Sequence, residues 1–250
     1  MGEEINKAMS ASEVFRFSIG KFNIVITDSL ITMWLIMIAL TIVAYIFSRD
    51  LKTIPGKRQS LVEAGLEFVG GICKKSIGHY WKAFVPYIAT LALFLIVSNM
   101  AAIFNVIPTA EDLYNFTGIE FFKDLPSYSI KPPTRDINVT AGLATMTMVV
   151  VISSIIYYKR FKGLIKTLCK PVAIMFPMNV LDLLIKPVSL CLRLFGNVLG
   201  AFITMEMVYI LCPVLIPAAL SMYFDLFDGM LQAYIFVFLT TIYIGEGLED

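Results

Sequence analysis

Three long runs without a charged residue constrain this fold more than any other feature. Ser29 to Ser48, Ala83 to Ala110 and Ile137 to Tyr158 contain no Asp, Glu, Lys or Arg. Each is about twenty residues or longer, which is enough to cross roughly 30 Å of hydrocarbon as a helix. None has the short apolar region and the cleavage site of a signal peptide. With 58% hydrophobic and 16% charged residues, the chain is predicted to be a polytopic all-α membrane protein.

The last third of the chain predicts two further crossings of unusual length. Residues 178–211 resemble one helix interrupted only by Pro187, and about 34 residues give about 50 Å. Residues 217–244 form a second helix of about 42 Å. Helices of this length must tilt strongly or bend, and Pro187 is the natural bend point. We therefore predict about five membrane-crossing helices, of which the last two are long and strongly tilted.

The predicted layout is one integral membrane domain over residues 1–250, without repeats or linkers. The spans lie near 29–48, 83–108, 137–158, 178–211 and 217–244, and an amphipathic cytoplasmic segment lies near 60–80. The loops 49–82 and 159–170 are rich in Lys and Arg, whereas the loop 111–136 is acidic. By the positive-inside rule, the two basic loops are cytoplasmic and the acidic loop is external. The N-terminus is then outside and the C-terminus is cytoplasmic.

The remaining composition favours no soluble chemistry. A formal net charge of +1 gives no reason to expect a nucleic-acid partner. The cysteines show no paired spacing, so they are interpreted as small apolar residues, and the single histidine, His79, does not make a metal site. We expect no cofactor, no metal and no ATP chemistry in this chain.

A polar stripe follows the first of the two long helices. At about 100° per residue its members fall within an arc of roughly 80°. They are Asn179, Asp182, Lys186, Ser189, Arg193, Asn197, Gly200 and Thr204. A stripe of this kind on a membrane helix is expected to face water or protein rather than lipid.

Arg193 lies in the middle of this stripe and keeps its proton at any accessible pH. A charge at membrane depth costs at least about 2.5 kcal/mol on insertion scales, and no acidic residue lies within one turn of it. A carboxylate on a partner is the obvious compensation. The alternative is that Arg193 reaches an interface or pairs with another span. Gly196 and Gly200 leave a shallow groove that admits another helix closely.

The second long helix also carries a polar face, formed by Ser221, Asp225, Asp228 and Gln232. Two carboxylates and an amide at membrane depth indicate a hydrated path. The alternative for Asp225 and Asp228 is that they cap the helix start at the outer interface.

Three segments resemble the family of ATP synthase subunit a. They are Lys186 to Asn197 (KPVSLCLRLFGN), Leu231 to Phe236 (LQAYIF) and Pro133 to Thr140 (PTRDINVT). The resemblance covers roughly residues 60 to 245 and implies an ion-channel stator of a rotary F-type ATP synthase, in a bacterial cell membrane. It also implies two offset half-channels beside a ring of c subunits, with a b-subunit peripheral stalk and a soluble ATPase sector as partners. Arg193 is then the essential arginine, and Asn197 and Gln232 are its polar neighbours.

The outer acids depart from the family pattern. Many bacterial members have a glutamate nine residues after the arginine and a histidine seven residues before the glutamine, where this chain has Phe202 and Asp225. Glu206 lies about 220° around the helix from Arg193, so we expect it to face the interior of the subunit. The alternative is an interfacial role. The other channel residues are assigned to the two ends of the path. Glu206, Asp225, Asp228 and Asp136 lie toward the outer end, and Asp182 and Asn179 lie toward the cytoplasmic end. Lys186 is a further channel residue of the stripe.

Two other classes of protein share some of these features. A secondary transporter also places charges at mid-membrane, but it usually shows an internal repeat, which this sequence lacks. A structural membrane subunit accounts for the spans and leaves the stripe unexplained. The sequence fits either protons or sodium, because the ring of c subunits makes that choice.

Overall fold

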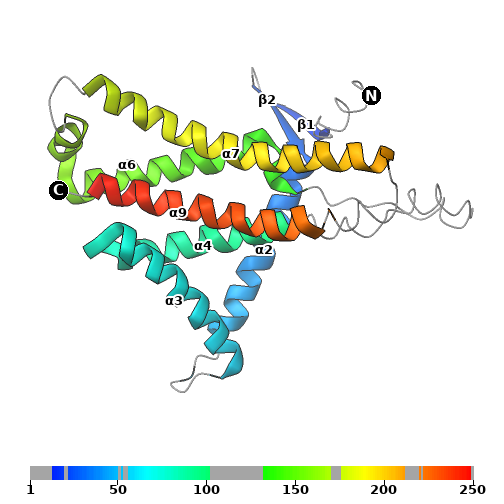
Figure 1. The fold of residues 1–250 in the computed structure, drawn as a ribbon, viewed down its shortest axis with the longest axis horizontal. Coiled ribbons are helices and arrows are strands. Elements are labelled where there is room, and N and C mark those ends of the chain that lie inside the picture. The colour runs from blue at the N-terminus through cyan, green and yellow to red at the C-terminus, as the bar shows by residue number, and fades with distance from the viewer. Residues whose placement is uncertain are drawn as a thin grey trace, which may run out of the picture. The chain divides into compact units, whose positions relative to one another are not determined.

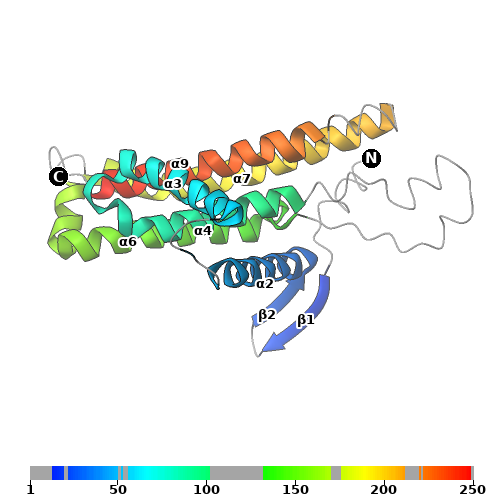
Figure 2. The same ribbon diagram turned by 90° about the horizontal axis from the view of Figure 1, so that it is seen from below.

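The computed structural model describes residues 13–19, 22–49, 52, 56–101, 132–169, 176–211, 220 and 222–248. Within them the chain starts with an antiparallel hairpin, β1 (Glu13–Ile19) and β2 (Phe22–Thr27), in which Phe17 pairs with Ile24. The hairpin leads directly into α2 (Asp28–Ser48), as Figure 2 shows. The sequence did not predict this hairpin, because its two strands are short and lie outside the apolar runs.

The helices of the membrane part follow in order along the chain (Figure 1). They are α3 (Lys57–Ile77), the 3₁₀ turn η1 (Gly78–Tyr80), α4 (Trp81–Met100), the 3₁₀ turn η4 (Pro133–Arg135), α6 (Ile137–Leu168), α7 (Phe176–Leu211), the π-helix η6 (Met222–Asp228) and α9 (Gly229–Leu248). Five stretches of helix are long and apolar enough to cross a membrane, and this confirms the all-α polytopic class. They are 28–48, 57–100, 137–160, 176–205 and 226–248.

Several helix ends differ from the predicted bounds. α7 runs continuously through Pro187, and α6 continues past Tyr158 across a kink at Arg160 (φ 59°) into residues predicted as a loop. The last helix is α-helical only from Gly229, because residues 222–228 are wound as a π-helix. Residues 102–108 and 217–219 of the predicted spans lie outside the described residues.

The chain divides into two compact units. The first contains the described residues up to Met37, those within 96–139 and those from Phe195 to Gln232. The second contains those from Ile38 to Leu95, from Thr140 to Leu194 and from Ala233 onwards. The prediction of a single domain stays a prediction.

The core of the second unit is built from apolar side chains at helical spacing. Leu190 and Leu194 of α7 are 1% and 0% exposed, and they lie four residues apart on one face. They are joined by further buried residues of α4, α6 and α9, namely Ile88, Leu91, Leu95, Ala144, Met148, Val151, Ile155, Phe236, Val237 and Ile244. The hydroxyl groups of Tyr87 of α4 and Thr147 of α6 form a hydrogen bond, with 3.4 Å between the two oxygen atoms. These contacts hold α4, α6, α7 and α9 of this unit side by side.

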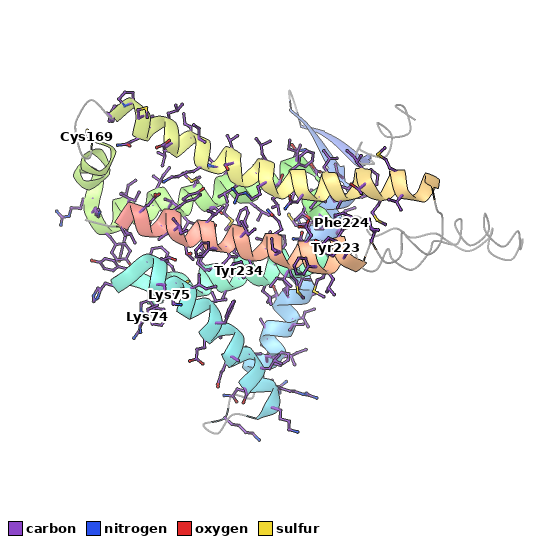
Figure 3. The ribbon with its side chains drawn as sticks, viewed as in Figure 1. Lys74, Lys75, Cys169, Tyr223, Phe224 and Tyr234 are labelled. Atoms are coloured by element: carbon purple, nitrogen blue, oxygen red, sulfur yellow. The ribbon has the colours of Figure 1, made fainter. Side chains whose placement is uncertain are left out.

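Two surfaces of the described helices match opposite environments. The part of α2 in the second unit exposes large apolar side chains, among them Ile38, Ile42, Tyr45 and Ile46, as expected of a helix that faces lipid. Lys74 and Lys75 are exposed near the end of α3 (Figure 3), where an amphipathic segment was predicted.

Gly78 ends α3 with φ 72°, a conformation that favours glycine.

Candidate functional site

Arg193 of α7 is exposed, whereas Leu190 and Leu194, about 60° and 100° around the helix from it, are buried. In the part of the chain that the structure describes, its guanidinium has neither a hydrogen bond nor an ion pair. A charge inside a candidate membrane span needs compensation by water or by an opposite charge. The intrachain pairing considered as an alternative is therefore absent among the described residues.

In the second unit, α7 also exposes large apolar side chains: Leu184, Ile185, Val188 and Leu192 are 50% to 63% exposed. In the first unit, Gly196 and Gly200 are exposed, and a Cβ built on either glycine would meet nothing within 4 Å. Small residues of this kind let another helix approach closely.

Asn197 and Gln232 meet in the first unit. The Asn197 Nδ2 donates to Gln232 Oε1 at 2.6 Å, which joins α7 to α9. Gln232 is 1% exposed, and its Nε2 has no hydrogen-bond partner among the described residues. The free end of this buried amide is a hydrogen-bond donor, which calls for an acceptor such as a water molecule.

A buried polar cluster lies elsewhere in the same unit. Asn99 of α4 donates from Nδ2 to the Gly229 carbonyl at 2.9 Å, and its Oδ1 accepts from Thr134 at 3.0 Å. A Cβ on Gly229 would lie 3.1 Å from the Asn99 Cβ, so glycine permits this close approach. Ser98, beside Asn99, is fully buried, and its Oγ has no partner among the described residues.

Asp136 has a clear structural role at the start of α6. Its Oδ1 accepts from the Asn138 backbone N–H at 2.9 Å and from Asn138 Nδ2 at 3.1 Å. Its Oδ2 accepts from Thr27 at 3.3 Å, which ties the end of β2 to α6. The carboxylate therefore caps α6. Its assignment to the outer path stays a prediction.

Arg135, next to this cap, places its guanidinium carbon 3.6 Å from the centre of the Phe202 ring on α7. This is a cation–π contact. Phe202 lies nine residues after Arg193, where the family resemblance implies a glutamate, so in this chain a cation lies against that position.

The other predicted outer acids are less fully described. The side chains of Glu206 and Asp225 lie outside the described residues, and Asp228 is half-buried at the end of η6, the element that also carries Tyr223 and Phe224 (Figure 3). The wheel that aligned Asp225 with Gln232 assumed an α-helix, and the wider π-helical turn changes that angle. The assignment of Asp225 to the Gln232 face stays a prediction.

Lys186, in the second unit, forms an ion pair with Glu246 of α9. Its Nζ also lies 4.9 Å from the centre of the Tyr243 ring. Asn179 is half-buried and Asp182 is exposed, on the same face of α7 as Lys186. Of these three predicted channel residues, Lys186 is thus the one that α9 engages.

Sequence reasoning missed Ser98, Asn99, Thr134 and Glu246. A signal was present for the first two, which interrupt an apolar run with adjacent polar residues. Glu246 lies close to the acidic end of the chain and gave no periodic signal.

These observations define a class of protein: a polytopic membrane protein with an exposed arginine inside a candidate span and buried polar side chains in its interior. A sequence model of the family described as ATP synthase A chain matches residues 30–245. The chain is also 32% identical over 231 residues to the protein named ATP synthase subunit a, sodium ion specific, of Propionigenium modestum. That alignment covers 92% of this chain and 77% of the relative.

The chain belongs to the ATP synthase A chain family. Members of this family form the ion half-channels of the membrane sector, beside the c ring, and they couple ion flow to ATP synthesis. The secondary transporter and the purely structural subunit are not favoured.

Proposed function

We propose that Arg193 is the fixed charge that separates the two half-channels of this subunit. The observation that carries the proposal is its exposed guanidinium inside a candidate membrane span, which has neither a hydrogen bond nor an ion pair among the described residues. A ring carboxylate that has lost its ion is costly in hydrocarbon, so it must be ionised only where it meets a cation. The same charge repels a cation that would leak directly from one half-channel to the other.

Asn197 and Gln232 assist at this point of the ion path. Asn197 occupies the Oε1 end of the Gln232 amide, and Nε2, which has no partner among the described residues, can donate to a neighbouring water. Ser98, Asn99 and Thr134 extend the polar interior of the first unit. We therefore place the outer path in this unit, with Glu206, Asp225, Asp228 and Asp136 as its acids.

The opposite path uses the start of α7 in the second unit, where Asn179, Asp182 and Lys186 share one face. The partners are the c ring, a b-subunit peripheral stalk and the soluble ATPase sector. The relative from Propionigenium modestum is named as sodium ion specific, so sodium and protons are both measured in the assays below.

The outer path has a direct test. Glu206→Gln and Asp225→Asn, each alone, are expected to lower passive ion flux through the membrane sector about tenfold, equivalent to about 1.4 kcal/mol in barrier. The double variant is expected to fall to background. Arg135 lies against Phe202, one turn before Glu206, and a cation there reduces the repulsion between two neighbouring acids. Flux is measured in reconstituted vesicles after removal of the soluble sector, and ATP-driven pumping is measured with it.

Glu67→Gln is the matched control, because Glu67 is exposed on α3 and removal of its charge leaves the proposed path unchanged. Normal flux in both single variants and in the double variant would move the outer path elsewhere. Asp228 and Asp136 would be tested next.

Orientation is a separate proposal. The basic segments 49–82 and 159–170 are assigned to the cytoplasm, the segment 111–136 to the outside, and the N-terminus to the outside with the C-terminus inside. In a cysteine-free background, Lys57→Cys is expected to resist a membrane-impermeant thiol reagent in vesicles of native orientation. It is expected to react in inverted vesicles. Labelling from the outside would reverse the assignment.

A further inference from the structure

The last turn of α9 is held tightly by two neighbouring helices of the second unit. A Cβ on Gly245 would lie 2.1 Å from the Ser76 carbonyl oxygen of α3. A Cβ on Gly247 would lie 2.8 Å from Ile155 Cδ1 of α6. Glycine at both positions lets α9 approach both helices closely, so the backbone of Glu246 between them has little freedom.

Two side chains of this turn hold Lys186 of α7. Glu246 forms the ion pair, and Tyr243, three residues earlier on α9, offers its ring to the same ammonium group. Residues three apart on a helix share a face, so they act on Lys186 together. The side chains of Lys186 and Glu246 are 28% and 55% exposed, so the pair lies at an accessible edge of the unit.

Lys186 has a second carboxylate within reach on its own helix. Asp182 lies four residues earlier, and an acid placed four residues before a lysine is the favourable order for a helical ion pair. Yet Asp182 is exposed and has neither an ion pair nor a hydrogen bond in the described part of the chain. The Lys186 ammonium group therefore pairs with Glu246 of α9 and not with Asp182 of its own helix.

We propose that Glu246 is a positioning residue that holds Lys186 on α9 and so leaves the Asp182 carboxylate free for the permeating cation. This rests on the proposed function, in which Asp182 serves the path at the start of α7. A cation that enters this path needs an unneutralised acid, and an intrahelical pair with Lys186 would remove it. The positive charge of Lys186 is then neutralised by Glu246 of α9.

The test compares the two halves of the ion pair. Glu246→Gln frees Lys186 to pair with Asp182 and is expected to lower passive ion flux about fivefold, the size of effect that an accessible ion pair can exert. Lys186→Gln removes the competitor and is expected to retain several-fold more flux than Glu246→Gln. The double variant is expected to recover to the level of Lys186→Gln. Flux is measured in vesicles that hold the complete complex, stripped of the soluble sector.

A merely structural ion pair predicts a different pattern, since losing either partner breaks it equally. Equal loss in the two single variants, or no recovery in the double variant, would overturn the proposal, as would normal flux in Glu246→Gln. Glu67→Gln controls for the loss of a carboxylate, and co-purification with the ring controls for assembly. Arg193→Ala is assayed in parallel. Coupled transport in that variant refutes the proposed function, whereas normal flux in Glu246→Gln refutes only this inference.

Discussion

Arg193→Ala is expected to abolish ATP-driven ion pumping and ion-driven ATP synthesis while the subunit still assembles with its ring. The guanidinium is exposed and makes no contact within the described residues, so its removal leaves the core residues Leu190 and Leu194 in place. Loss of one partner from a desolvated charge pair costs about 2–5 kcal/mol, which predicts at least about a 30-fold loss of coupled rate. Pumping and synthesis are measured in reconstituted vesicles.

The matched control is Arg58→Ala, which removes an exposed arginine near the start of α3. It is expected to pump at the rate of the unaltered complex. Substantial ATP synthesis by an assembled Arg193→Ala complex would contradict the proposed role of Arg193 between the two half-channels. Loss of the subunit from the purified complex would instead indicate a packing role, which its exposure argues against.

The features of single helices could be predicted from the sequence. The stripe on α7 depends only on a period of 3.6 residues, so the neighbours of Arg193 along the helix follow from their spacing. The five membrane-crossing helices follow from apolar length for the same reason. The resemblance also implied roles for Asn197 and Gln232. The hydrogen bond between their amides depends on the packing of α7 against α9, which a single-helix pattern does not give.

Contacts between distant segments could not be predicted. Asn99 and Gly229 are 130 residues apart, and no periodic pattern in either helix selects the other. The wheel for Asp225 assumed α-helical geometry, and no pattern in the sequence indicated that residues 222–228 are wound as a π-helix. Lys186 illustrates a third limit. Asp182 lies four residues before it, at favourable spacing for an ion pair, but in the structure Lys186 pairs with Glu246.

Gly245 is the residue at which the packing of the second unit depends most on the absence of a side chain. Its Cβ would lie 2.1 Å from the Ser76 carbonyl oxygen and 3.0 Å from the Ser76 carbonyl carbon, both backbone atoms that cannot rotate away. Glycine in a helix interior is otherwise unfavourable by about 0.5–1 kcal/mol relative to alanine. The close approach of α9 to α3 accounts for its presence, and it fixes the turn that carries Glu246.

Gly245→Ala is therefore expected to lower the melting temperature of the complex and to reduce the amount of this subunit that co-purifies with the ring. α9 and α3 must separate by roughly 1 Å to admit the methyl group, and overpacking of this kind costs about 1–3 kcal/mol or more. Gly65→Ala is the matched control, because a Cβ on Gly65 of α3 meets nothing within 4 Å and the gain in helix propensity of about 0.5–1 kcal/mol remains. The two substitutions should thus shift the melting temperature in opposite directions. A Gly245→Ala complex as stable as the unaltered one would show that α9 does not approach α3 this closely, and Glu246 would lose the rigid support on which its hold on Lys186 depends.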